Sequence, residues 1–339
     1  MTVTNNNMKK WLQYSLLLVF VGNTAFAQVQ KKRSAILMGG RFDITIVAKD
    51  TTVANNYIDT VIAEIRRIEY LISDWIPTTQ ISQVNQNAGI KPVKVDREVF
   101  ELTKRAIAFS ELTGGAFDIS FAAMDRIWKF DGTMETMPSP EAIKKSVERV
   151  GYKRIVLDSA ASTIYLPEKG MKIGYGAIGE GYAADKCKEL MRSKGIEAGI
   201  VNATGDMSLW GRQLNGKPWN IGITNPFNHT NVYAVLPVKQ EAVTTSGTYE
   251  KFVEFDGIRY SHIINPVTGY PATGLTSVTI LGESTEIANC LSTSIMVLGA
   301  EKGLALLAQF PAYSSIMISD KGKVITSKNF KRKKIRKIL

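Results

Sequence analysis

Patterns typical of helices and of strands alternate along nearly the whole chain. Apolar residues recur at helical spacing from Ile58 to Ile72 and from Val99 to Ile107, whereas residues 198–201, 219–223 and 277–281 are short apolar runs typical of strands. The sequence shows no internal repeat and no low-complexity linker. We therefore predict a single compact domain of the α+β class, in which helices and strands are mixed.

Further elements are predicted between and beyond these segments. Helices are expected at about 140–150, around Ala183, Cys187 and Leu190, and at 286–298 and 301–310, and strands at 36–47 (interrupted at Met38-Gly39-Gly40), 154–157, 163–166, 232–238 and in a hairpin over 314–326.

The first 27 residues have the composition of a secretory signal. Lys9 and Lys10 precede an apolar run from Trp11 to Val21, and Ala25-Phe26-Ala27 provides the small residues of a cleavage site. The apolar run is short for a membrane span, although an uncleaved signal would still tether the chain. We predict export to the periplasm, with 1–27 as signal peptide, 28–34 as a polar leader, 35–327 as the folded domain and 328–339 as a basic tail.

The formal charge of +11 is concentrated at the two ends of the chain. Twelve Lys and Arg residues lie in the segments 9–10, 31–33 and 328–337, and removing them from +11 leaves the remainder close to −1. This distribution argues against a nucleic-acid partner. The basic tail is either a solvated end or a peripheral contact with anionic lipid of the inner membrane.

The chain has two cysteines, Cys187 and Cys290, both on apolar faces of helical patterns. In an exported protein they are either two buried thiols or one disulfide bridge. No Cys/His cluster suggests zinc.

His262, one of two histidines, is the strongest candidate for proton transfer. It lies where a short strand pattern gives way to the turn residues of the segment from Tyr260 to Pro271. An imidazole ordinarily exchanges protons near neutral pH, and a loop mouth is where a substrate can reach it.

The segment Gly174-Tyr175-Gly176-Ala177-Ile178-Gly179 matches the pattern G-x-G-x-x-G before a helical segment. One reading is a dinucleotide-binding Rossmann turn, although few apolar residues precede it and Asn202 stands where an acidic residue is expected. The other reading is a bend that directs backbone groups at a diphosphate and its metal. That reading requires an oxygen-rich partner.

Such a partner is present in the helix expected at 286–298. Glu286, Asn289 and Thr293 recur at i, i+3 and i+7, which places them on one helix face, and oxygen ligands of this kind suit Mg²⁺. The alternative is an ordinary polar start of a helix.

Taken together, these segments resemble the ApbE family, the exported FAD:protein FMN transferases, from roughly Ser34 to Phe310. The matching segments are Met38-Gly39, Gly115-Ala116-Phe117-Asp118, the turn containing Ile178, Gly181-Tyr182-Ala183 and Asp185, the strand end Asn202-Ala203-Thr204-Gly205-Asp206, then Thr245-Ser246-Gly247, Tyr249-Glu250, Asp256-Gly257, residues 260–271, and the helix from Ala288 to Gly299. Several separate motifs in one order are more specific than any single pattern.

The resemblance implies a Mg²⁺-dependent transfer of the FMN half of FAD to a Thr or Ser hydroxyl of a partner protein, with release of AMP, in a cleft between two lobes. It implies flavin or FAD contacts at Met38, Trp75, Ala116, Phe117, Asp118, Gly174, Glu180 and His262, a metal site at the Ala177 carbonyl, Asn289 and Thr293, and a catalytic role for His262. Without it, Trp75 would be read as capping a helix and Phe117 as core.

Three matched positions depart from the family pattern. Gly174 and Asn289 stand where many relatives have Asp, and Glu180 stands where they have Lys. A neutral amide in place of a carboxylate weakens a divalent cation site, and we expect Glu286 to restore the missing charge. Two alternatives to the transferase therefore stay open: an exported FAD-binding protein with weak or no transfer, and a Mg²⁺-dependent pyrophosphatase that cuts FAD to FMN and AMP.

Overall fold

The computed structural model describes residues 28–248, 251–330 and 336–337. The expected signal peptide, Tyr249-Glu250 and residues 331–335 and 338–339 of the tail lie outside the described residues. The helices are α2 (Thr51–Ile72), α3 (Gln80–Gln86), α4 (Arg97–Leu112), α5 (Pro140–Ser146), α6 (Gly179–Ser193) and α7 (Thr285–Leu307), with 3-10 turns η1 (Ile119–Ala123) and η2 (Tyr152–Arg154). The strands are β1 (Val29–Leu37), β2 (Gly40–Ala48), β3 (Val93–Lys94), β4 (Val156–Asp158), β5 (Thr163–Tyr165), β6 (Ala198–Ala203), β7 (Asp206–Trp210), β8 (Trp219–Asn225), β9 (Asn228–Val238), β10 (Ala242–Gly247), β11 (Phe252–Phe255), β12 (Ile258–Ser261), β13 (Leu275–Gly282), β14 (Ser314–Ser319), β15 (Val324–Thr326) and β16 (Arg336–Lys337).

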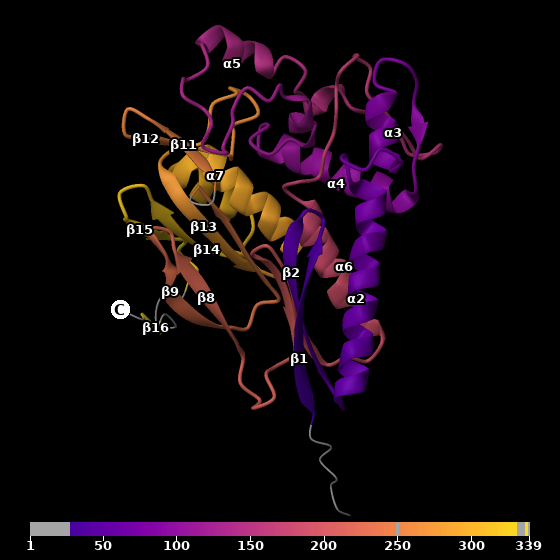
Figure 1. The fold of residues 1–339 in the computed structure, drawn as a ribbon, viewed down its shortest axis with the longest axis vertical. Coiled ribbons are helices and arrows are strands. Elements are labelled where there is room, and N and C mark those ends of the chain that lie inside the picture. Colours follow the sequence, from indigo (N-terminus) through magenta and orange to yellow (C-terminus); the bar gives the residue numbers. More distant parts are fainter. Residues whose placement is uncertain (1–27, 249–250, 331–335, 338–339) are drawn as a thin grey trace, which may run out of the picture.

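An antiparallel sheet of eight strands, in the order β1-β2-β6-β7-β10-β13-β14-β15, forms the centre of the molecule (Figure 1). Successive side chains of a strand point to opposite faces. Ile46 and Ile280 accordingly pack with the helices α2 and α7, while their neighbours Val47 and Leu281 pack with β8 and β9. The sheet is thus covered by α2, α6 and α7 on one face and by the small sheet β16-β9-β8 on the other. The prediction of one domain that mixes helices and strands is confirmed.

The first two strands form a hairpin, with Met38 (φ 52°) and Gly39 (φ 78°) in its turn. The interruption predicted at Met38-Gly39-Gly40 is therefore the turn itself. Residues expected as a polar leader contribute to β1, whose side chains alternate between half-buried and exposed as in an edge strand.

Helix α7 contains the helix predicted at 286–298 and most of the one predicted at 301–310, which ends at Leu307. Gly299 has φ 78° and ψ 173°, a conformation outside the helical region that glycine adopts easily, and it separates the two halves. Among the described residues only α7 is long and apolar enough to cross a membrane, but half of that stretch is buried, as in a core helix. Cys290 on α7 and Cys187 on α6 are both buried free thiols, so no disulfide forms.

A second cluster of core residues lies beside the sheet. The C-terminal part of α2 packs there with α3, α4 and the three-stranded sheet β3-β5-β4. We call this segment, with α3, α4 and the sheet β3-β5-β4, the helical part. It is one of two lobes, the other being the eight-stranded sheet with α7, and the candidate site lies between them. The tail is not wholly separate from the fold, because β16 pairs with β9.

Candidate active site

A cavity of about 440 Å³ lies between the helical part and the sheet. Ten of the eleven predicted site residues line it: Trp75, Ala116, Phe117, Asp118, Gly174, Ala177, Glu180, His262, Asn289 and Thr293. They come from the loop after α2, the segment before η1, the glycine turn and the start of α6, the residue after β12, and α7. Residues separated by more than 200 positions therefore meet around one space.

Met38 is the exception, since it does not line the cavity. Its half-buried side chain packs against the two core clusters on either side of it. A Cβ placed on Gly179 would lie 3.5 Å from the Met38 methyl group. Met38 therefore supports the glycine turn from behind.

The glycine turn has no strand directly before it: residues 171–178 are irregular, and α6 begins at Gly179. All strand pairings in the described part of the chain are antiparallel, whereas a Rossmann turn belongs to a parallel βαβ unit. The dinucleotide-binding reading of this turn is therefore wrong. Gly181 serves close packing instead, because a Cβ there would lie 2.6 Å from the backbone oxygen of Thr285.

The aromatic and acidic residues on the helical side differ in exposure. Trp75 is 70% exposed, and the Arg126 guanidinium lies 4.2 Å from its ring centre, so Trp75 does not cap α2. Phe117 is buried edge-to-face against Phe109 at 5.5 Å and is a core residue at the cavity wall. Of these two aromatic residues, Trp75 has the exposed ring that could stack on a planar ligand.

Asp118 has a structural role that its motif does not reveal. Its carboxylate accepts bonds from the Ser120 amide at 2.7 Å, the Ser120 hydroxyl at 2.6 Å and the Tyr152 amide at 3.0 Å. Burial raises the pKa of the Asp118 carboxyl, and these donors oppose the rise. Asp118 therefore fixes the loop that contains Ala116 and Phe117.

His262 directly follows β12, as the sequence predicts, and it is exposed at the cavity. Its backbone amide donates to the Lys251 carbonyl at 3.1 Å, and its Nδ1 lies 3.2 Å from the same oxygen. With Nδ1 protonated and donating to this oxygen, Nε2 is the proton acceptor of the ring.

The opposite wall is rich in oxygen atoms. Asn289 is 6% exposed, and its Nδ2 donates to Asp206 Oδ2 at 2.6 Å, while its Oδ1 is buried without a hydrogen-bond partner among the described residues. The hydroxyl of Thr293 lies 3.5 Å from that of Ser246, which lies 2.8 Å from the hydroxyl of Ser292. Burial raises the pKa of Asp206 well above its ordinary value, and the nearby Glu180 raises it further.

These donors suit a hard divalent cation, which takes carboxylate, amide, carbonyl and hydroxyl oxygens. The partnerless Oδ1 of Asn289 is the observation that favours a cation, because buried acceptors normally have partners. Ala177 and Thr293 line the same cavity. No group of three or more His, Cys, Asp or Glu side chains suitable for a metal occurs in the described part of the chain.

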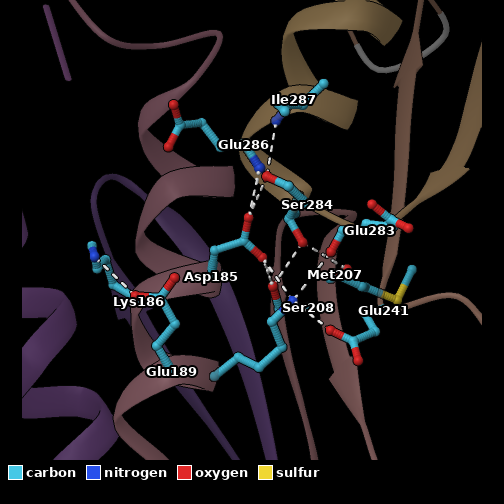
Figure 2. Close-up of polar contacts among 12 residues, drawn as sticks. Asp185, Lys186, Glu189, Met207, Ser208, Glu241, Glu283, Ser284, Glu286 and Ile287 are labelled. Atoms are coloured by element: carbon cyan, nitrogen blue, oxygen red, sulfur yellow. Dashed lines mark hydrogen bonds and ion pairs between the residues drawn. The ribbon is translucent and has the colours of Figure 1, made fainter. Parts of the chain in front are cut away.

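The expectation that Glu286 restores a missing carboxylate is wrong. Both oxygens of Glu286 bind Arg105, at 2.7 and 3.0 Å, in a separate surface groove between α4, α6 and α7. Glu286 lies in the first turn of α7, and its side chain points away from Asp185, as Figure 2 shows. The i, i+3, i+7 spacing was compatible with one face, but Arg105 attracts this side chain elsewhere.

Several residues line the cavity that the sequence did not identify as site residues. Asp206 and Asp74 both line the cavity, as do Thr245 and Ser246. Asp206 ends the motif Asn202-Ala203-Thr204-Gly205-Asp206, and an acidic residue directly after a turn is a recognisable candidate. Asp74 lies beside Trp75 and has no comparable motif.

The sequence and the fold are similar to those of known proteins. The ApbE family profile matches residues 38–317. The FAD:protein FMN transferase of Treponema pallidum is 33% identical over 77% of this chain and 76% of its own, and one from Klebsiella pneumoniae is 29% identical over 87% and 90%. The ApbE protein of Thermotoga maritima superposes with a TM-score of 0.82 at 30% identity, covering 91% of this chain and all of that one, and the flavin transferase ApbE of Vibrio cholerae with 0.78 at 25%, covering 89% and 98%. The chain therefore belongs to the ApbE family.

Proposed function

We propose that the protein is a Mg²⁺-dependent FAD:protein FMN transferase that links FMN to a Thr or Ser hydroxyl of an acceptor protein and releases AMP. The observation that supports this most directly is the single cavity that brings together His262, the glycine turn and the oxygen-lined wall at Asn289 and Thr293. Family relatives named for this activity support the choice of substrate. The two alternatives, FAD binding without transfer and FAD hydrolysis, are separated by the experiment below.

The reaction requires one bond to form and one to break. The acceptor hydroxyl oxygen attacks the phosphorus on the FMN side of the diphosphate, and the bond from that phosphorus to the bridging oxygen breaks, so that AMP leaves with that oxygen. The hydroxyl proton passes to a base. His262, exposed at the cavity with Nε2 as its acceptor, is positioned to receive this proton from a hydroxyl that enters from outside.

The other residues bind and orient the substrate. The exposed Trp75 ring is available to stack on the planar isoalloxazine. Asn289, Thr293 and the Ala177 carbonyl would hold Mg²⁺, which when bound neutralises charge on the diphosphate oxygens. Glu180 adds negative charge to the same cavity, which makes a cation there more important for admitting phosphates.

The test is an incubation of the protein with FAD, Mg²⁺ and an acceptor domain. We expect covalent flavin fluorescence on the acceptor and stoichiometric AMP. AMP without labelled acceptor indicates hydrolysis, and bound intact FAD indicates a carrier; either result refutes the transferase.

We expect His262→Asn to lower the kcat of transfer by roughly 10²-fold or more, because proton transfer to a positioned base contributes about this factor. FAD affinity, measured by fluorescence titration, should change little. Arg259→Ala is the matched control, since Arg259 lies on β12, which directly precedes His262, and pairs with Glu254 outside the cavity. Equal kcat for His262→Asn and the control would remove His262 from the mechanism.

We also infer that the protein is exported, on the pattern of residues 1–27, and acts in the periplasm. The basic tail supports a peripheral contact with an anionic membrane surface.

A further inference from the structure

One wall of the cavity contains a carboxylate that the family resemblance does not assign to the cation. Asp206 is 6% exposed and lines the cavity beside Asn289. In the described part of the chain, no Lys or Arg lies within ion-pair distance of it. The charged form of a buried carboxylate without a positive partner is unfavourable, and a bound cation stabilises that form.

The amide of Asn289 is oriented by this carboxylate. Its Nδ2 donates to Asp206 Oδ2 at 2.6 Å, and the reverse orientation would set two acceptor oxygens against each other. Oδ1 of Asn289 is consequently turned away from Asp206 and left buried without a partner among the described residues. One neighbouring pair thus presents an anionic oxygen and an unused neutral oxygen.

We propose that Asp206 is the anionic ligand of the divalent cation in this protein, and that Asn289 ligates the same cation through its amide oxygen. The pair would together supply the carboxylate that the helix position 289 lacks. This inference rests on the cation dependence included in the proposed function, and it replaces the compensating role expected of Glu286.

The backbone holds the two residues in place independently of any ligand. Asp206 is the first residue of β7, after a two-residue turn in which Thr204 (φ 49°) and Gly205 (φ 111°) have positive φ, and it pairs with Thr244 of β10. Asn289 lies one turn into α7, and α6 approaches so closely that a Cβ on Gly181 would lie 3.1 Å from the Asn289 Cβ. A rigid ligand pair is what selective cation binding requires.

Glu180 is the competing candidate. It lines the same cavity and raises the pKa of Asp206, so it lies close enough to interact. Glu180, however, is only half-buried, whereas Asp206 is buried, and the Glu180 carboxylate accepts a hydrogen bond from the Thr204 hydroxyl, on the turn before Asp206. We assign Glu180 to that turn and the cation to Asp206.

The experiment measures Mn²⁺ binding to the whole protein by the EPR signal of free Mn²⁺, with and without FAD. The variants are Asp206→Asn, Asn289→Asp, the double exchange of both, Glu180→Gln and, as a matched carboxylate on the same helix, Glu286→Gln. We expect Asp206→Asn to weaken Mn²⁺ binding about tenfold or more, because ligand charge sets affinity, and the double exchange to recover most of the loss. Glu286→Gln should bind as the wild type does.

The outcomes separate the inference from the function on which it rests. If Asp206→Asn binds Mn²⁺ as tightly as the wild type, or if only Glu180→Gln loses Mn²⁺ affinity, the role of Asp206 is overturned and the cation dependence still stands. Absence of Mn²⁺ binding by the wild type, with FAD present, overturns both. The melting temperature of each variant, measured without metal, distinguishes lost ligation from misfolding; a double exchange that folds but does not recover binding also counts against the pair.

Discussion

At the residue scale, Asp74 lies beside Gly174 in the cavity wall, so that a side chain from another segment fills the place where glycine has none. A Cβ at Gly174 would lie 3.2 Å from Asp74 Oδ2 and 3.1 Å from the Ala122 Cβ. Burial raises the pKa of the Asp74 carboxyl, and Arg126 and Lys172 oppose the rise. Asp74 therefore places a carboxylate next to position 174, where the family resemblance implies Asp.

This arrangement predicts the effect of restoring the family residue. Gly174→Asp would set a second carboxylate against Asp74, so we expect FAD affinity to fall roughly tenfold, about 1.4 kcal/mol. Fluorescence titration of FAD measures this. Gly174→Ala controls for crowding, and combining Gly174→Asp with Asp74→Asn should recover affinity. If Gly174→Asp binds FAD as tightly as the wild type, the carboxylate of Asp74 does not take the place of a side chain at position 174.

At the element scale, Asp185 joins α6 to α7. Its Oδ2 accepts from the Ser284 hydroxyl at 2.8 Å and the Glu286 amide at 3.0 Å, at the positive end of α7, and its Oδ1 accepts from Ser208 at 2.5 Å (Figure 2). Lys188 lies 3.2 Å away and is buried. Asp185 thus sets the start of the helix that presents Asn289 and Thr293, and it is a positioning residue.

Removing this charge should destabilise the fold. For Asp185→Asn we expect a loss of about 2–3 kcal/mol in the free energy of unfolding, since charge-assisted bonds are lost and Lys188 loses its nearest carboxylate. Glu189→Gln on the same helix, in an exposed pair with Lys186, should change it by less than about 0.5 kcal/mol. Urea unfolding compares the two, and equal losses would contradict the linking role of Asp185.

At the scale of the whole molecule, two parts of the fold form the site together, and neither part forms it alone. The sheet and α7 supply the oxygen-rich wall, and the loops after α2 and α4 supply the aromatic side. The net charge is not distributed between these two parts. The excess of basic residues lies near the two ends of the chain, and the net charge of the remainder is close to zero.

Export is the prediction that belongs to this scale. We expect the protein recovered from the periplasm to begin at Gln28, as shown by N-terminal sequencing, because cleavage is expected after Ala27. Cytoplasmic protein that retains Met1 would contradict export, and a retained signal in a membrane fraction would instead indicate a tether.

The sequence by itself determined the elements whose signals are local. Apolar periodicity located α2 and α4, and a glycine separated the two helices that form α7 around Gly299. The strand β10 was missed because half of its residues are polar, namely Thr244, Thr245 and Ser246, which pair with β13 inside the structure. Separate motifs in one order identified the family and ten residues of the cavity.

Only the tertiary structure decided how distant charges pair. Glu286 was expected at the cation, but Arg105, 181 positions away, binds it outside the cavity. Asp206 contacts Asn289, 83 positions further along the chain, and Asp74 lies next to Gly174, 100 positions further along. Helical spacing determines which side chains share a face of a helix. The partner of each charged side chain depends instead on which elements the fold brings together, because electrostatic contacts act over a few ångströms in space, whatever the separation along the chain.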